Sequence, residues 1–491
     1  MKRSESGRVF AISAGCAQRH MKITFIQRDV YDYVGLMQLV AVLEQGGHTC
    51  SVIVDFSDAA ILRRLRANPP DLAGMTCSAG VSYKDALRIC ARIKQELPQV
   101  RTIIGGAYAT LYPEIFEAPG LDFMCRGEGE YPLLELADAL GSGQSAESIP
   151  NISARTPGGA IVHNELRDLI SDIDTLPFPE RKHHYEHACL RIQQRKNFIV
   201  TRGCPFNCSY CYVNSMRRIY EGKGRFVRTH SPEYTIEEIV RVKRDYGMTY
   251  VGFMDDSFPT DPEWLKPFAA LYRERVNLPF IAAARAEALN DERLRLLAHA
   301  GCDIIGIGVE SASEELRAGV LERRGGDNRQ LVDVLRAARA HGIKLLTFNM
   351  LGIPGETVAD GWATVELNAS VRADLPRFTV LTPSPGLKIA DTATEMNLCT
   401  ETDIKGTSTY LKKSVIRQQG IDELVRIQKV AYAAVRYPRF NWLWKLLVRR
   451  APAFVLDFIY LATNGFMFLA INKWSIPFTI KYGRTVSRWY E

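Results

Sequence analysis

Short apolar runs alternate with segments of helical spacing along the first third of the chain. Between residues 21 and 145 the apolar runs are KITFIQ (22–27), CSVIVD (50–55), LAGMTC (72–77), VRTIIGG (100–106) and LDFMC (121–125). The segments between them carry apolar residues three and four positions apart, which is the spacing of amphipathic helices. Strands that alternate with helices are typical of βαβ units. The pattern therefore predicts an α/β domain with a doubly wound parallel sheet over residues 21–145.

A second alternating series begins near residue 196. Its apolar runs are FIVTR (198–202), TYVGFMDD (249–256), FIAAARA (280–286), IIGIGVE (304–310), LLTFNMLG (345–352) and FTVLTP (378–383). Six βα units in order predict a full or partial parallel barrel over residues 196–390. Ligands of such barrels bind at the carboxyl ends of the strands.

The remaining segments lack this alternation. Residues 1–20 have a basic start but no apolar stretch long enough for a signal peptide, and we expect a disordered extension. Residues 146–195 are polar and include a Pro-Phe-Pro stretch, which predicts an extended linker. Three histidines lie in this linker without a cysteine or carboxylate at matching spacing, and we expect them to be solvated: His183, His184 and His187.

The C-terminal region, residues 391–491, is first helical and then strongly apolar. The run 451–471 is long enough to span a bilayer, but it contains Asp457, and an unpaired carboxylate at mid-bilayer is unfavourable. Basic residues flank the run and tryptophans lie nearby, which suits a helix at a membrane interface. Residues 440–491 are therefore predicted to make peripheral membrane or hydrophobic-substrate contacts, with packing on the barrel as the alternative.

Composition narrows the functional classes. The chain has 491 residues, 46% of them hydrophobic and 24% charged, as in a globular protein with a core. The net charge of +7 is mild, and no block of Lys and Arg indicates nucleic-acid binding. Most of the eleven cysteines lie singly in apolar runs, which favours a cytoplasmic protein over a disulfide framework.

Three cysteines stand close together directly after the first strand of the second series. Cys204, Cys208 and Cys211 have the spacing CxxxCxxC, and three thiolates in one loop can bind three corners of an iron–sulfur cube. A structural zinc site needs a fourth Cys or His at short spacing, and none follows soon after Cys211. The loop is therefore predicted to hold a [4Fe–4S] cluster with one iron open to another ligand.

This motif resembles that of the radical S-adenosylmethionine (SAM) superfamily over about residues 196–390. That family places an aromatic residue before the third cysteine, as Tyr210 is here, and the motif follows the first strand of an incomplete barrel. The resemblance implies that the open iron chelates the amino and carboxylate groups of SAM. An electron from an external donor such as flavodoxin or ferredoxin would then split the C–S bond, giving methionine and a 5′-deoxyadenosyl radical.

The resemblance also implies a set of SAM contacts at the strand ends. Asp255 and Asp256 close the second strand, where relatives hold the methionine amino group, and Arg285 ends the third, where it would pair with the carboxylate. Glu310 matches the position that contacts the ribose, and Gly352 opens a GIPGE loop like the one near the adenine. The alternatives are exposed acids at strand ends and a simple Pro-Gly turn.

The N-terminal half resembles the cobalamin-binding subgroup of that superfamily. GGxxxT follows the fourth strand and GEGE the fifth, whereas the GxGxxG fingerprint of NAD or FAD domains is absent after the first strand. The resemblance implies that the corrin or its nucleotide tail is lined by Thr76, Cys77, Ser78, Gly105, Gly106, Thr110 and Glu128. Residues 29–35 read DVYDYVG in place of DxHxxG, so no histidine is expected on the lower face of the cobalt.

The leading functional hypothesis is a cobalamin-dependent radical SAM methyltransferase. Its substrate would be an unactivated carbon of a small, hydrophobic biosynthetic intermediate. The alternative is a radical oxidoreductase that forms a ring or inserts oxygen, because the arrangement also resembles the anaerobic magnesium-protoporphyrin monomethyl ester cyclases. Methylthio transfer to RNA is disfavoured because the first domain lacks three aligned cysteines. A non-catalytic sensor would not need the barrel positions around the cluster motif.

Overall fold

The N-terminal sheet has seven strands in the order β2-β1-β3-β4-β5-β6-β7. They are β1 (Lys22–Gln27), β2 (Thr49–Val54), β3 (Leu72–Thr76), β4 (Arg101–Gly105), β5 (Phe123–Cys125), β6 (Ile152–Arg155) and β7 (Ile161–His163). Strands β1 to β5 are parallel, and β6 and β7 are antiparallel.

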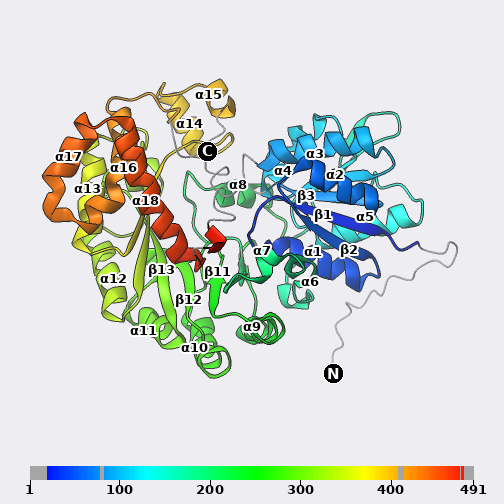
Figure 1. Ribbon diagram of the computed structural model, residues 1–491, viewed down its shortest axis with the longest axis horizontal. Helices are drawn as coiled ribbons and strands as arrows, with labels where there is room; N and C mark the ends of the chain where they lie inside the picture. The colour runs from blue at the N-terminus through cyan, green and yellow to red at the C-terminus, as the bar shows by residue number, and fades with distance from the viewer. Residues whose placement is uncertain (1–18, 78–81, 407–413, 476, 480–491) are drawn as a thin grey trace.

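The structure, a computed structural model (Figure 1), describes residues 19–77, 82–406, 414–475 and 477–479.

Helices cover both faces of this sheet. They are α1 (Val34–Gln45), α2 (Asp58–Ala67), α3 (Ser82–Glu96), the short α4 (Ala107–Leu111) and α5 (Glu130–Gly141). Alternate residues of a strand point to opposite faces, so Phe25 packs in the core beneath α1 and α5, and Ile26 in the core beneath α2 and α3. The doubly wound α/β fold expected from the sequence is confirmed.

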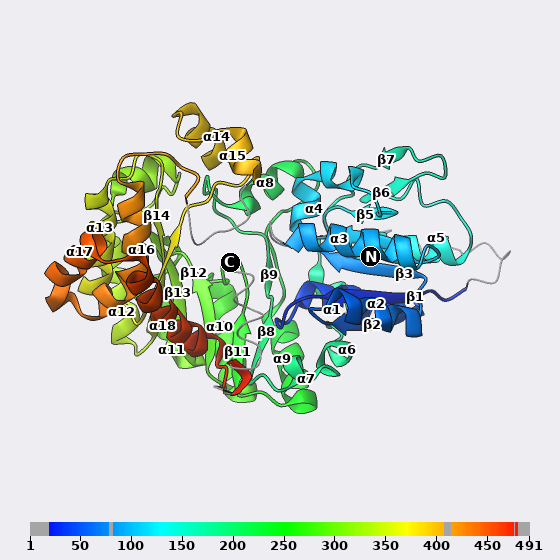
Figure 2. The same ribbon diagram turned by 45° about the horizontal axis from the view of Figure 1, so that its top comes forward.

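The second sheet has six parallel strands in the order β15-β14-β13-β12-β11-β8. They are β8 (Arg195–Phe198), β11 (Tyr250–Phe253), β12 (Phe280–Ala284), β13 (Cys302–Glu310), β14 (Lys344–Leu351) and β15 (Leu375–Val380). Strand β8 pairs with β11 but not with β15, so the barrel is partial, as expected. A small antiparallel pair, β9 (Thr201–Arg202) and β10 (Arg228–Thr229), continues beyond β8. Figure 2 shows β8 and β9 next to the N-terminal domain.

Helices also surround this partial barrel. On its outer side lie α9 (Pro232–Tyr246), α10 (Pro262–Leu271), α11 (Asp291–Ala300), α12 (Asn328–Ala340) and α13 (Val358–Ser370), while α8 (Tyr212–Ile219) follows the cysteine loop. The C-terminal helices are α14 (Lys388–Glu395), α15 (Glu401–Gly406), α16 (Ile421–Arg436), α17 (Asn441–Arg450) and α18 (Ala453–Asn472). The outer helices and α16 share one large core with the strands.

The segment assigned to a linker is more ordered than the sequence indicated. Strands β6 and β7 lie within it, and two short helices follow, α6 (Lys182–Tyr185) and α7 (Ala188–Arg191). The expectation that its histidines are solvated is wrong for His184, which is fully buried. Burial lowers the pKa of His184 to about 3, so its ring is neutral. His183 pairs with Glu44 at 2.7 Å, because the segment packs against the first domain.

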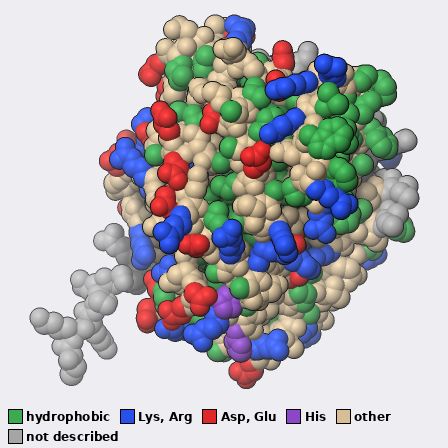
Figure 3. All heavy atoms as spheres, turned by 90° about the vertical axis from the view of Figure 1, so that its left-hand side faces the viewer, with side chains coloured by type: hydrophobic (Ala, Val, Ile, Leu, Met, Phe, Trp, Pro, Cys, Tyr) green, Lys and Arg blue, Asp and Glu red, His purple; other side chains and the backbone are tan. Residues whose placement is uncertain are grey.

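Helix α18 packs one face on the protein and exposes the other. Met467 lies against the face of the second sheet opposite the outer helices, beside residues near the beginnings of the strands such as Tyr250 and Ile304. Beyond the helix, Trp474 stacks on Tyr31 of the first domain, with ring centroids 6.0 Å apart. The alternative of packing on the barrel therefore holds for one side of α18. Figure 3 views the side of the molecule that carries α17, where hydrophobic side chains remain at the surface.

Candidate active site

The cysteine loop lies between β9 and α8. Gly203 begins it with φ +81°, and a Cβ there would come within 2.7 Å of the carbonyl oxygen of Phe226, so this tight entry requires glycine. Cys204 and Cys208 are buried, and Cys211 caps α8 with partial exposure. The three thiols are thus presented at the carboxyl end of the first strands of the partial barrel.

Other elements hold this loop from several sides. The Ser209 hydroxyl donates to the Val320 carbonyl at 2.7 Å, and the Ile389 amide donates to the Ser209 carbonyl at 3.1 Å. Tyr210 Oη donates to Glu310 Oε1 at 3.1 Å. A loop fixed in this way needs little reorganisation when its thiols bind iron.

The donor set fits an iron–sulfur cluster. Burial raises the pKa of Cys211 to about 12, so a thiolate is stable there only with a compensating positive charge, which iron ions provide. Arg285 Nη1 donates to Cys208 Sγ at 3.3 Å. Within the described residues, no three His, Cys, Asp or Glu side chains converge as they would around a single metal ion. A [4Fe–4S] cluster does not require such convergence, because each thiolate binds a different iron at a separate corner of the cube.

Two of the residues predicted to contact SAM lie close to the cysteine loop. Glu310 ends β13 with a strained φ of +63° and also accepts from Arg323 Nη1 at 2.8 Å. Burial raises the pKa of Glu310, and Arg323 opposes that shift. Arg285 stacks over Phe206 within the loop, at 4.2 Å from the ring centroid, and pairs with Glu287. Arg285 thus contacts the cluster motif directly.

The other predicted SAM residues have different surroundings. Asp255 Oδ1 accepts from the Val200 amide at 2.9 Å, Oδ2 is buried without a hydrogen-bond partner, and burial raises the pKa of Asp255 to about 7. Asp256 lines the central cleft described below. Gly352 lies against Ile421 at the start of α16. The unpartnered oxygen of Asp255 is an acceptor that a bound ammonium group would satisfy.

A cleft of about 530 Å³ opens between the carboxyl ends of the first sheet and the cysteine side of the barrel. Of the residues predicted to contact cobalamin, Thr76, Gly105, Gly106 and Glu128 line it. Cys77 and Thr110 are buried beneath the lining, and Ser78 lies outside the described residues. Gly35, in α1 of the same domain, also lines the cleft, and a Cβ there would meet no atom within 4 Å, so the cleft has room beside the backbone at this point.

The two glycine loops are joined to each other. Thr110 Oγ1 donates to the Gly106 carbonyl at 2.9 Å and accepts from the Gly127 amide at 2.8 Å. Gly106 has φ +101°, and a Cβ there would lie 2.8 Å from Thr76 Oγ1 and 3.0 Å from the Cys77 carbonyl oxygen. The packing of the protein itself therefore requires this glycine. Any larger side chain would displace the loop after β3 as well as a ligand.

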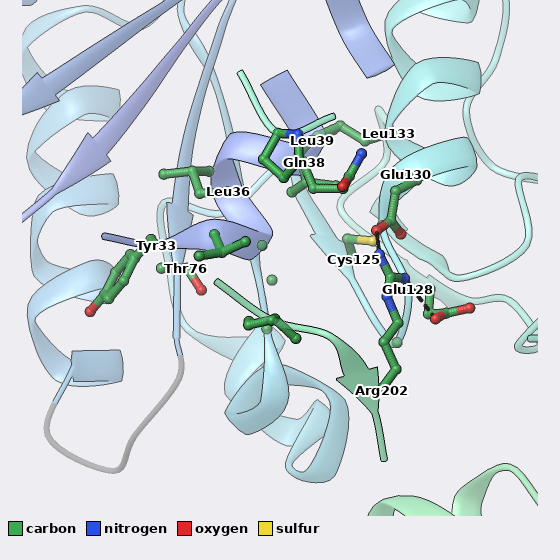
Figure 4. A pocket seen from close by; sticks show the side chains of 18 of the residues that line it. Tyr33, Leu36, Gln38, Leu39, Thr76, Cys125, Glu128, Glu130, Leu133 and Arg202 are labelled. Carbon is green, nitrogen blue, oxygen red and sulfur yellow. Dashed lines mark hydrogen bonds and ion pairs between the residues drawn. The ribbon is translucent and has the colours of Figure 1, made fainter. Parts of the chain in front are cut away.

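Sequence reasoning missed an arginine that connects the two domains. Arg202, two residues before Cys204, reaches across the cleft, where Nη1 donates to Glu128 at 2.8 Å and Nη2 to Glu130 at 2.6 Å. Arg228 also pairs with Glu128, at 2.9 Å. Figure 4 shows Arg202 extending from β9 toward both carboxylates. Glu128 is thus engaged by two arginines, and the Oε2 atom of Glu130 is buried without a partner.

Sequence reasoning also missed a histidine in the cleft. His230 follows β10, bonds Asp174 through Nδ1 at 2.7 Å and stacks on Tyr234 with centroids 4.1 Å apart. Burial lowers the pKa of His230, which favours the neutral ring. All nine histidines fall within the described ranges, and His230 is the one that lines the cleft, from the barrel side. The described wall from the first domain contains no imidazole.

Comparison with known proteins agrees with this geometry. A model of the radical SAM superfamily matches residues 198–367, and a model of the B12-binding domain matches residues 28–137. The chain belongs to the cobalamin-binding radical SAM enzymes. The cofactors of this radical SAM enzyme are therefore a [4Fe–4S] cluster, SAM and cobalamin, and the residues around the cysteine loop and the cleft fit them.

Relatives of this radical SAM enzyme include an uncharacterized methyltransferase of Pyrococcus horikoshii, 28% identical over 70% of this chain and 73% of the relative. An anaerobic magnesium-protoporphyrin IX monomethyl ester cyclase of Rubrivivax gelatinosus is 25% identical over 71% of this chain and 63% of the relative. Among solved structures, the radical SAM methyltransferase TsrM of Kitasatospora setae, with cobalamin and a [4Fe–4S] cluster bound, has a TM-score of 0.62. It is 18% identical, covers 77% of this chain and 75% of its own, and shares the fold.

Proposed function

We propose that this enzyme transfers a methyl group to an unactivated carbon of a small hydrophobic molecule. The observation that carries the proposal is the shared cleft. Gly105 and Gly106 of the cobalamin domain line the same cavity as Gly203, which begins the cysteine loop. When bound, the cofactors supply the radical and the methyl group, while the protein positions them and excludes solvent. One common cavity would let a substrate carbon face both cofactors.

The cleft walls favour an apolar substrate. Leu36, Leu39 and Leu133 line the side of the first domain, and Val213 and Met216 of α8 line the barrel side. Charged side chains also line the cleft, but Arg202 pairs with Glu128 and Glu130, and the apolar part of the lining is the larger. These walls would also exclude water, which a reactive intermediate requires.

Product mass spectrometry with deuterated-methyl SAM tests the proposal. We expect a product that carries one labelled methyl group, formed by anaerobically reconstituted enzyme with candidate lipid-like and tetrapyrrole substrates. Cys208→Ala is the matched control and should give neither product nor 5′-deoxyadenosine, because one cluster ligand is missing. An unlabelled product would contradict methyl transfer.

The second candidate function is oxidative cyclisation or oxygen insertion. It is supported by the relative that is named as an anaerobic magnesium-protoporphyrin IX monomethyl ester cyclase, and by the same apolar walls. The labelled experiment separates the two functions, because oxidation would consume SAM and change the product mass without transferring the label.

The proposal includes two kinds of partner. An external one-electron donor such as flavodoxin or ferredoxin would reduce the cluster, and reduction by either purified protein tests this directly. We place the enzyme in the cytoplasm, with peripheral membrane contact through residues 440–491. The exposed apolar side of that segment supports the membrane contact.

A further inference from the structure

The outer face of α17 and α18 is apolar where surface helices are ordinarily polar. On α18 the exposed fractions are 73% for Phe454, 73% for Phe458, 68% for Leu461 and 59% for Phe466. Phe454, Phe458 and Leu461 are three or four residues apart and therefore form one stripe along the helix, and Phe466 lies to one side of it. Large aromatic side chains exposed together in this way mark an interaction surface.

Helix α17 also exposes large hydrophobic side chains. Trp442 is 67% exposed and Leu446 41% exposed, one helical turn apart. Phe440, just before the helix, is 38% exposed. Figure 3 shows hydrophobic side chains on this side of the molecule, with Lys and Arg around them. We define the docking face as Phe440, Trp442, Leu446, Phe454, Phe458, Leu461 and Phe466.

The charges around the docking face are predominantly positive. Each of the three nearby acids is already paired: Asp457 with Lys429 at 2.6 Å, Glu366 with Lys445 at 3.1 Å and Glu423 with Arg449 at 3.5 Å. Three exposed arginines have no ion-pair partner within the described part of the chain: Arg436, Arg439 and Arg450. Their charge complements anionic headgroups, and the apolar stripe complements acyl chains.

We propose that the docking face binds the surface of an anionic phospholipid bilayer, with α17 and α18 lying in the plane of the interface. The proposal rests on the membrane contact proposed above for residues 440–491 and specifies its surface and lipid, and it does not depend on whether a methyl group is transferred.

The contacts of α18 with the rest of the protein favour an orientation along the membrane surface over a spanning one. The helix is long and apolar enough to cross a membrane, yet its inner face is part of the protein core, with Leu456 at 0% and Met467 at 5% exposure. Its C-terminal end is held by Arg195, which donates to the Ile471 carbonyl at 2.9 Å, and by Lys473, which pairs with Asp303 at 3.2 Å. Insertion across a bilayer would break these contacts, whereas surface binding keeps them.

A second copy of the chain fits the docking face less well. In a twofold interface the same patch meets itself, so the unpaired arginines of one copy would approach those of the other. Like charges brought together at an interface are unfavourable. A bilayer with anionic lipids offers the opposite charge to the same residues.

Vesicle co-sedimentation of the full-length, cluster-loaded enzyme tests the proposal. We expect binding to vesicles of phosphatidylcholine with phosphatidylglycerol, weaker binding to phosphatidylcholine alone, and loss of the difference at high salt. Phe454→Ser combined with Phe458→Ser should weaken binding by about tenfold or more, because two aromatic side chains no longer enter the acyl region. Arg436→Gln, Arg439→Gln and Arg450→Gln together should abolish the preference for anionic lipid.

Controls keep folding and binding separate. Ile192→Ser changes an exposed apolar residue (53%) outside the docking face and should leave vesicle binding unchanged. All variants should retain the iron content and 5′-deoxyadenosine formation of the parent enzyme. Failure of the parent to bind anionic vesicles, or binding by the double phenylalanine variant equal to the parent, overturns the proposal. A third outcome also overturns the proposal: the parent enzyme forms a concentration-dependent dimer, and the double phenylalanine variant is a monomer. The docking face would then be an interface between two copies of the chain.

Discussion

Tyr210 Oη donates a hydrogen bond to Glu310 Oε1 and thereby connects the loop that carries Cys204, Cys208 and Cys211 to the end of β13. Glu310 holds its strained backbone while it accepts this bond and one from Arg323. The residue that precedes Cys211 in the motif and the carboxylate predicted to contact the ribose of SAM therefore form one unit. A change at either residue should reach the other.

Tyr210→Phe tests this unit. The substitution removes one of the two donors that orient the Glu310 carboxylate. A hydrogen bond to a charged group contributes about 1.5 kcal/mol or more, so the affinity for SAM should fall by about tenfold. The iron content should stay unchanged, since the cysteines are retained. Equilibrium binding of SAM to the reconstituted enzyme is the measurement.

The matched control is Tyr272→Phe, which removes a buried hydroxyl that has no hydrogen-bond partner. It should leave SAM affinity unaltered. Equal losses in the two variants would mean that Tyr210 acts through general packing.

Arg202→Met tests the connection between the domains. The substitution leaves Glu130 buried without its cation and removes one of two arginines from Glu128, so the free energy of unfolding should fall by about 3 kcal/mol. Thermal unfolding under anaerobic conditions measures the loss. Adding Glu130→Gln should restore part of it, because the neutral amide does not need a counter-charge.

Arg244→Met is the reference for this experiment. Arg244 pairs with its neighbour Asp245 at the exposed surface, and removing such a pair has no measurable effect on stability. If Arg202→Met behaves the same way, the contact across the cleft is not stabilising.

Stability should also depend on pH through Glu356. Burial raises the pKa of Glu356 to about 8, whereas its carboxyl titrates near 4.5 in the unfolded chain. Between these values the folded protein binds one more proton, so the free energy of unfolding falls as pH rises, by at most about 1.4 kcal/mol per pH unit. Above about pH 8 both states are ionised and this dependence ends.

Glu356→Gln should flatten this part of the curve, because the amide does not titrate. Urea unfolding of both proteins from pH 5 to pH 9 measures the difference. Asp255, with its own raised pKa, remains in both proteins and cancels from the comparison. If the free energies of unfolding of the two proteins change with pH in parallel, Glu356 is already ionised in the folded protein over this pH range.

Electron paramagnetic resonance tests the lower face of the cobalamin. Bound Co(II) should give a base-off spectrum without nitrogen superhyperfine splitting, because the described wall from the first domain contains no histidine. His230→Gln should give the same spectrum, since that ring is tied to Asp174 on the barrel side. If the parent enzyme shows imidazole splitting and His230→Gln does not, His230 coordinates the cobalt, and the expectation of a lower face without histidine is wrong.

The features that could be predicted from the sequence are those that depend on residues close together along the chain. Cys204, Cys208 and Cys211 share one loop, and the alternation of strands and helices follows from local apolar spacing, so both could be inferred without coordinates. The pairing of Arg202 with Glu128 could not, because the partners belong to different domains and only the tertiary fold brings them together. For the same reason nothing in the spacing indicated that His230 faces the cleft.

Two further differences have physical causes. Strands β6 and β7 are short, with four and three residues, too brief for their alternation to stand out from a polar linker. His184 is buried because the linker packs between the domains, although its sequence neighbours are charged. The apolar run of α18 was ambiguous since both of its sides are hydrophobic, and the fold covers one of them.

The contact of Trp474 with Tyr31 has a consequence for biosynthesis. A chain that emerges from the ribosome from its N-terminus can fold the first sheet early, because the strand pairs of that sheet are close in sequence. The Trp474 contact joins residues near opposite ends of the chain, and such non-local contacts form late. The first domain therefore completes this part of its packing only after the chain has been synthesised as far as Trp474.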